Sequence, residues 1–117
     1  MRDFKTKTAL GGKVTVVEVP DTLDLHCSED FRELVEELVQ KEHCRIVMDL
    51  SKTRYVDSSG LSAFVSRIAA ARSKRGDIRF AAPSKFILDL FQITHLNQIL
   101  KIFDDVDSAV ESFEDGQ

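Results

Sequence analysis

The residues with the clearest chemical potential are Asp57, Ser58, Ser59 and Gly60, which stand between Val56 and Leu61. A serine hydroxyl can accept a phosphoryl group, which adds a charge of roughly −1.5 to −2. Ser58 lies between an acid and small residues, so a kinase active site could reach it. A structural interpretation is also open, in which Asp57 or Ser58 caps a helix and Gly60 lets its first turn pack closely.

A phosphate on Ser58 would lie at the start of a predicted helix, where free N–H groups and the helix dipole favour anions. Asp57, and Asp24 from a second loop, would oppose the new charge. Because the start of a helix favours anions, we nevertheless expect the fold to tolerate this modification. A partner that covered the same place would have to bury an unpaired dianion, which costs several kcal/mol on the order-of-magnitude scale for buried charges.

The elements that must position these residues include strands rich in β-branched and apolar side chains. Residues 14–19 predict a strand between Gly11-Gly12 and Pro20, and the glycine pair predicts a turn from an antiparallel strand near residues 4–10. Residues 46–50 form a nearly continuous apolar run, as in a strand covered on both faces. Further strands are predicted at 78–81 and 99–103.

Helices are predicted where apolar residues recur at intervals of three and four. The first follows Ser28, taken as its N-cap, and carries the stripe Phe31, Leu34, Val35, Leu38 and Val39. The second begins near Ser58 and stops at Gly76, a residue suited to a left-handed C-terminal cap. A third opens at Pro83-Ser84, and a last one carries Ala109, Val110 and Phe113.

This alternation predicts an α/β fold with a mixed, mostly parallel sheet of four to five strands flanked by about four helices. Function in such sheets usually lies in loops at the carboxyl ends of the strands. That rule selects residues 20–28 and 51–60. The length of 117 residues predicts one domain, 1–117, and we expect the end of the chain, 113–117, to fray.

The composition excludes several classes of partner. The net charge is −4 with interleaved acids and bases, which argues against direct nucleic acid binding. The basic cluster at residues 72–75 is interpreted as a helix end. No stretch approaches the roughly 20 apolar residues of a membrane span, so we expect no membrane insertion. Two cysteines without a secretion signal predict reduced thiols and a cytoplasmic location.

Three other chemistries fit poorly. A phospho-aspartate receiver would need two adjacent acids after the first strand, and the strand at 14–19 leads instead to Pro20-Asp21. A serine hydrolase would need a G-x-S-x-G elbow, and the downstream His95 stands among apolar residues, where partial burial is expected. The pairs His26-Cys27 and His43-Cys44 bracket a helix and lie too far apart for one metal ion, so we expect no metal site and two buried thiols.

Five segments together carry a resemblance to a known family: Thr22-Leu23-Asp24 before a helix, Ile46 to Ser51, the stretch Tyr55 to Leu61, Phe86 to Phe91 with Leu96, and Ile102-Phe103 before Asp107 to Val110. In these residues the chain resembles the STAS family of anti-sigma factor antagonists, also called anti-anti-sigma factors. The string Asp-Ser-Ser-Gly-Leu is the most specific of these. Pro20-Asp21-Thr22 and Ser62 depart from glycines that are common in the family.

The resemblance implies a phosphoprotein of transcription regulation that works by partner switching and is not itself an enzyme. In its unphosphorylated form it would bind an anti-sigma factor, a serine kinase whose ATP-binding fold is like that of histidine kinases, and so release the sigma factor. Phosphorylation of Ser58 would stop binding, and a serine phosphatase would restore it. The partner-binding surface implied is Asp24, Asp57, Ser58, Ser59 and Gly60, with no cofactor.

A different role within the same fold stays open. STAS modules also serve as scaffold or regulatory subunits in stress-signalling complexes, or in lipid and anion transport systems. The intact Asp57-Ser58 pair favours the sigma regulator.

Overall fold

The main sheet has five strands in the computed structural model, which describes residues 4–114. Its order is β1-β2-β4-β6-β7, where the strands are β1 Thr6–Ala9, β2 Val14–Glu18, β4 Arg45–Asp49, β6 Asp77–Ala81 and β7 Lys101–Phe103. β1 pairs antiparallel with β2, and the other three pairings are parallel. The expected α/β class and the mixed sheet are confirmed.

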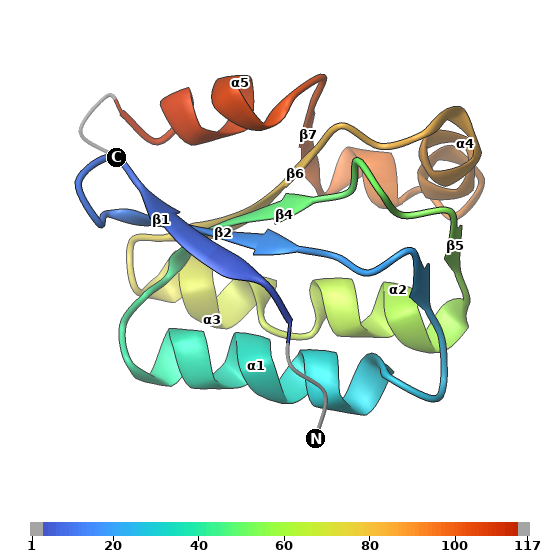
Figure 1. Cartoon of the computed structure of the whole chain (residues 1–117), viewed down its shortest axis with the longest axis horizontal. Coiled ribbons are helices and arrows are strands. Elements are labelled where there is room, and N and C mark those ends of the chain that lie inside the picture. Colours follow the sequence, from blue (N-terminus) through green and yellow to red (C-terminus); the bar gives the residue numbers. More distant parts are fainter. Residues whose placement is uncertain (1–3, 115–117) are drawn as a thin grey trace.

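A second, very small sheet was not predicted. β3 (Thr22–Leu23) and β5 (Tyr55–Val56) pair in parallel beside the carboxyl ends of β2 and β4 (Figure 1). Two residues are too few to show the alternating pattern by which a strand is recognised in a sequence. This short pairing is nevertheless what joins the two loops that the sequence analysis selected.

Helices cover both faces of the sheet. α1 (Ser28–Gln40), α2 (Ser58–Val65) and α3 (Ile68–Ser73) lie on one face and α5 (Val106–Glu111) on the other, while α4 (Lys85–Ile93) lies near β5 (Figure 1). A short 3-10 turn, Leu96–Gln98, precedes β7. Ser84 caps α4 by accepting a hydrogen bond from the Ile87 N–H, as its position before the helix suggests.

Three expectations about helix ends are wrong. Ser28 is the first residue of α1 and not its cap; the cap position is Cys27, whose side chain makes no capping bond. The helix predicted from Ser58 to Gly76 is divided into α2 and α3. Its left-handed end is Arg75 (φ 66°), whereas a side chain at Gly76 would overlap the Cys44 backbone, so Gly76 is required for close packing.

The core lies on both faces of the sheet. The larger part lies between the sheet and α1–α4, where Phe64 makes edge-to-face contacts with Phe31, Phe80 and Phe91. The smaller part lies under α5 and includes Val47 and Phe113. We expected the chain to fray from residue 113, but Phe113 is buried in this part of the core. Residues 115–117 lie outside the described part of the chain.

Both cysteines, Cys27 and Cys44, are buried free thiols, as expected. Within residues 4–114, no helix has the length and apolar character needed to cross a membrane.

Candidate functional site

The site is formed where the loop after β2 meets the loop after β4. The β3–β5 pairing sets Thr22 opposite Tyr55 and Leu23 opposite Val56. The Asp21 carbonyl oxygen accepts hydrogen bonds from the Arg54 and Tyr55 N–H groups at 2.7 and 3.1 Å. Residues 20–28 and 51–60 therefore form one continuous surface, as the position of both loops at the carboxyl edge of the sheet predicts.

Asp57 is the N-cap of α2 and holds this surface together. Its Oδ1 accepts hydrogen bonds from the Ser59 N–H, the Ser59 hydroxyl and the Gly60 N–H at 2.9, 2.6 and 3.1 Å. Its Oδ2 accepts one from the Leu25 N–H at 3.2 Å. One carboxylate thus joins the first turn of α2 to the loop that carries Asp24.

These hydrogen bonds stabilise the ionised form of Asp57. The hydroxyl of Ser59 contributes most to lowering the pKa of the Asp57 carboxyl, and the N–H groups of Gly60, Ser59 and Leu25 lower it further. The carboxylate is therefore charged at neutral pH, and both of its oxygens are engaged within the protein. It positions the loops, whether or not it also touches a partner.

Ser58 stands out from its neighbours because its hydroxyl is unused. The residue is exposed, and its Oγ makes no hydrogen bond with any described residue, since Asp57 has taken the capping role. Ser59 is half-buried and donates to Asp57. The Ser59 hydroxyl is therefore less accessible to another protein than the Ser58 hydroxyl.

Gly60 is buried and does not contribute an exposed side to the surface. A Cβ built on it would lie 2.5 Å from the Leu23 carbonyl oxygen and 2.7 Å from Val56 Cγ1. The structural interpretation of Gly60, close packing of the first helical turn, is confirmed. Its contact with a partner stays a prediction.

Asp24 lies in the neighbouring loop and is half-buried. Its Oδ1 accepts a hydrogen bond from the His26 N–H at 3.0 Å, and its carbonyl oxygen accepts from the Cys27 and Ser28 N–H groups. This is an Asx turn leading into α1. Asp24 shapes its own loop and is brought next to Asp57 through Leu25.

Arg32 is a functional candidate that the sequence did not suggest. From α1 it donates through a terminal guanidinium nitrogen to Ser62 Oγ at 3.1 Å, while its Nε is buried without a hydrogen-bond partner. Ser62 is four residues after Ser58, one turn along the same side of α2. The spacing of the two serines could have indicated a shared face, but not which residue of α1 faces it.

Exposed apolar side chains lie beside the exposed serine. Leu25 is 76% exposed in the Asp24 loop, and Tyr55 precedes Ser58 by three residues with 48% of its surface exposed. Such side chains are typical of protein interfaces, where aromatic and aliphatic groups surround a polar centre. No periodic pattern in the sequence marks Leu25 as exposed.

His95 differs from its expected environment. It is exposed, with a left-handed backbone (φ 63°) at the start of the 3-10 turn. The expected partial burial is wrong because the chain turns sharply there instead of continuing a packed element. Among residues 4–114, no group of three or more His, Cys, Asp or Glu side chains is arranged to hold a metal ion.

Known proteins resemble this chain over most of its length. The family model described as STAS domain matches residues 6–109. The anti-sigma F factor antagonist of Paenibacillus polymyxa is 28% identical over 102 residues, which cover 86% of this chain and 87% of that protein.

Two solved structures have the same fold. An anti-sigma-factor antagonist (STAS) domain protein of Planctomyces limnophilus superposes with a TM-score of 0.85 at 16% identity, covering 97% of this chain and 99% of its own. The Bacillus cell fate determinant SpoIIAA in its phosphorylated form gives a TM-score of 0.73 at 18% identity, covering 94% of this chain and 98% of its own.

Proposed function

The chain belongs to the STAS domain family, and on that premise we propose that it is an anti-sigma factor antagonist whose partner binding is switched off by phosphorylation of Ser58. The anti-sigma factor antagonist role is supported by the Paenibacillus relative. The choice of Ser58 is supported by one observation above all: its hydroxyl is exposed and unbonded, while Asp57 caps the helix in its place.

The fold can accept a phosphate on Ser58, though not chiefly for the reason first expected. The Ser59 and Gly60 N–H groups at the start of α2 are already bound by Asp57, so they are not free to hold the phosphate. Arg32 offers a different compensation, because its guanidinium reaches Ser62 one turn along the helix. A cation there offsets part of the repulsion from Asp57.

The same phosphate would prevent docking. In the unmodified protein the surface around Ser58 combines the exposed side chains of Leu25 and Tyr55 with a small neutral hydroxyl. A partner that covers this surface must remove water from whatever stands at its centre. A buried dianion without a partner costs several kcal/mol, and each ~1.4 kcal/mol weakens binding tenfold.

The proposed partners are those that the family resemblance implies. The first is an anti-sigma factor that also acts as the serine kinase, with an ATP-binding fold like that of histidine kinases. The second is a serine phosphatase that removes the phosphate. Both would act in the cytoplasm, and the chain itself would be a substrate with no cofactor of its own.

The proposal is tested by incubating the protein with purified anti-sigma factor kinases and ATP, mapping phosphate by mass spectrometry, and measuring binding by calorimetry. We expect phosphate on Ser58 and at least a hundredfold weaker binding of the phosphorylated form. Ser58→Ala should stay unphosphorylated and bound, and Ser58→Asp should bind weakly with little change in melting temperature.

Ser73→Ala is the control, since it removes an exposed hydroxyl at the end of α3, outside the two loops of the site, and should still be phosphorylated on Ser58. Asp24→Ala should reduce partner affinity more than it reduces stability. Phosphate found on another residue while Ser58 is bare would contradict the assignment. Equal affinity of the phosphorylated and unphosphorylated proteins would contradict the switch itself.

The scaffold or transport role remains the alternative. The intact Asp57-Ser58 pair, with Asp57 as the cap and Ser58 exposed, favours the antagonist role over it. The alternative would be favoured if the protein bound no anti-sigma kinase but joined a larger complex independently of the state of Ser58.

A further inference from the structure

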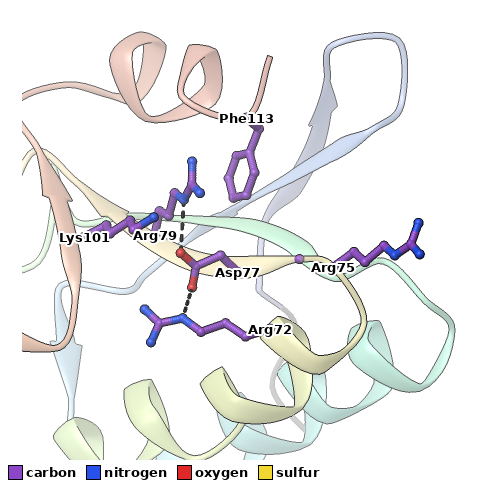
Figure 2. Close-up of a pocket in the computed structure, with 7 residues that line it drawn as sticks. Arg72, Arg75, Asp77, Arg79, Lys101 and Phe113 are labelled. Carbon is purple, nitrogen blue, oxygen red and sulfur yellow. Dashed lines mark hydrogen bonds and ion pairs between the residues drawn. The ribbon is translucent and has the colours of Figure 1, made fainter. Parts of the chain in front are cut away.

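A cavity of about 410 Å³ lies at the opposite end of the sheet from Ser58. It opens where α3 ends and β6 begins, and the end of the described chain after α5 closes one side of it (Figure 2). Its lining consists of Arg72, Arg75, Gly76, Asp77, Arg79, Lys101 and Phe113. The cations come from three separate parts of the chain, so the sequence shows only Arg72 and Arg75 as a cluster.

Arg79 forms the fixed wall of this cavity. Its side chain is only 9% exposed, and its Nε donates to Asp77 Oδ2 at 3.1 Å. One terminal nitrogen donates to the Ser112 carbonyl and hydroxyl oxygens at 2.8 and 2.6 Å, and the guanidinium carbon lies 4.0 Å from the centre of the Phe113 ring. Such a guanidinium is held in one orientation before any ligand arrives.

Asp77 is the only acid in the lining, and it is already paired with two arginines. Its side chain is 4% exposed, and its two oxygens accept from Arg79 and from Arg72 Nε, the latter at 2.8 Å. Arg75 and Lys101 are exposed and make no ion pair with any residue of the described chain. The lining therefore has four cations against one carboxylate, in a chain whose net charge is −4.

A purely structural role does not account for this excess. The buried Arg79 needs Asp77 as its counter-charge, because a buried ion without a partner is costly. Neither Arg75 nor Lys101 is needed for that pairing. Both add positive charge to the lining that no carboxylate of the lining balances.

We propose that this cavity is a binding site for a small multivalent anion, a compound with two or more phosphate groups. Guanidinium groups pair with phosphate oxygens through two parallel hydrogen bonds. Two phosphates carry a charge of roughly −3 to −4, on the basis of about −1.5 to −2 each, and so match the surplus positive charge. The cavity volume lies within the usual range of small-ligand sites, about 300–1,000 Å³.

The experiment uses tripolyphosphate as the probe, with binding measured by calorimetry at about 0.1 M salt, where the Debye length is ~10 Å. The test variant replaces two exposed cations of the lining, Arg75→Gln with Lys101→Gln. The control replaces two exposed cations of β1 and the residue before it, Lys5→Gln with Lys7→Gln, and has the same net charge. We expect the wild type and the control to bind equally well, and the test variant to bind at least tenfold more weakly.

Arg79→Lys provides a second test that keeps the charge and removes the planar donor group. It should also bind at least tenfold more weakly, with its fold verified by circular dichroism. Wild-type protein that does not bind tripolyphosphate would overturn the proposal. So would an equal loss in the β1 control, because binding would then depend on net charge alone.

A final experiment distinguishes binding of a soluble ligand from binding of a lipid headgroup. The protein is sedimented with vesicles containing an anionic phospholipid and with neutral vesicles. We expect no more protein on the anionic vesicles than on the neutral ones. Sedimentation that depends on Arg75 and Lys101, combined with no binding of tripolyphosphate, would assign the cavity to a membrane surface and overturn the soluble ligand.

Discussion

The two ends of the sheet use aspartate in opposite ways. At the carboxyl end, Asp57 accepts hydrogen bonds from backbone N–H groups and a hydroxyl, and no cation pairs with it in the described structure. At the amino end, Asp77 is buried between the guanidinium groups of Arg72 and Arg79. The Asp57 carboxylate fixes the backbone of a surface loop and of the start of α2, and the Asp77 carboxylate balances the charge of a buried arginine.

This difference determines what each end can do. At the carboxyl end the capping carboxylate leaves Ser58 exposed and neutral, which is the basis of the proposed partner binding and of its control by phosphorylation. At the amino end the fixed Arg79 and the unpaired Arg75 and Lys101 are the basis of the proposed anion site. The comparison also predicts that the two aspartates will differ in their importance for stability.

The largest effect is expected for Asp77→Ala. Removal of this carboxylate leaves Arg79 buried without a counter-charge and should lower the free energy of unfolding by about 3–5 kcal/mol. Urea denaturation measures the loss. The control is Asp89→Ala, which breaks the exposed pair with Lys85 and should cost less than about 1 kcal/mol. Similar losses in the two variants would show that Asp77 does not balance a buried charge.

The next effect is expected for Gly60→Ala, which tests the packing of the carboxyl end. The new methyl group would overlap the Leu23 carbonyl and Val56, at a cost of about 3 kcal/mol, the upper part of the range for overpacking. Gly11→Ala is the control, because Gly11 has φ 66° but open space around it, and should cost about 1 kcal/mol. Thermal unfolding of both variants checks the order. The packing argument fails if Gly11→Ala is the more harmful change.

A smaller effect is expected from the titration of Asp57. Because its pKa is lower in the folded than in the unfolded protein, the carboxylate stabilises the fold at pH values above the ordinary pKa near 3.8. That contribution is lost as the pH falls through the folded-state pKa. Asp57→Asn should therefore be less stable than wild type at pH 7, and the difference should shrink towards pH 2.

Melting temperatures measured from pH 7 to pH 2 test this prediction. The pKa of Asp105 is lowered in the same way, by the Ser108 N–H first, but this group is present in both proteins and its effect cancels. A difference between wild type and Asp57→Asn that stayed constant with pH would show that the charge of Asp57 is unimportant.

The smallest effect is expected for Arg32. In the unmodified protein, Arg32→Gln should change stability little, whereas in the Ser58→Asp background it should cost up to about 1 kcal/mol more, the range of a partly exposed ion pair. A double-mutant cycle with Ser58→Asp and Arg32→Gln isolates this coupling. Arg67→Gln is the control, since Arg67 pairs with Glu36. No coupling, or the same coupling for Arg67, would show that Arg32 does not specifically offset a negative charge at position 58.

Much of the fold could be predicted because long elements repeat their apolar pattern many times. The stripe from Phe31 to Val39 and the run at 46–50 correspond to α1 and β4. The β3–β5 ladder could not, because two residues carry no period. The break between α2 and α3 could not either, since the apolar pattern continues across Ser66 and Arg67.

The candidate site was only partly predictable. The string Asp57-Ser58-Ser59-Gly60 indicated a helix start, and the position of the loops indicated that Asp24 would lie near it. Whether the Ser58 hydroxyl is free depends on whether Asp57 or Ser58 caps α2. Only the three-dimensional structure shows that Asp57 is the cap. The amino-end cavity was missed because Arg79 lies within β6 and Lys101 comes only after β6, α4 and the following turn, so neither stands beside Arg72 and Arg75 in the sequence.

The β3–β5 ladder has a consequence for any enzyme that modifies Ser58. The conformation of residues 54–60 depends on the Asp21 and Leu23 carbonyl groups, more than 30 residues earlier in the chain, so the substrate is a discontinuous epitope. A short synthetic peptide with the sequence of residues 51–62 lacks those acceptors. It should be a poor kinase substrate compared with the intact domain, and an antibody raised against it should recognise the denatured chain in preference to the native one.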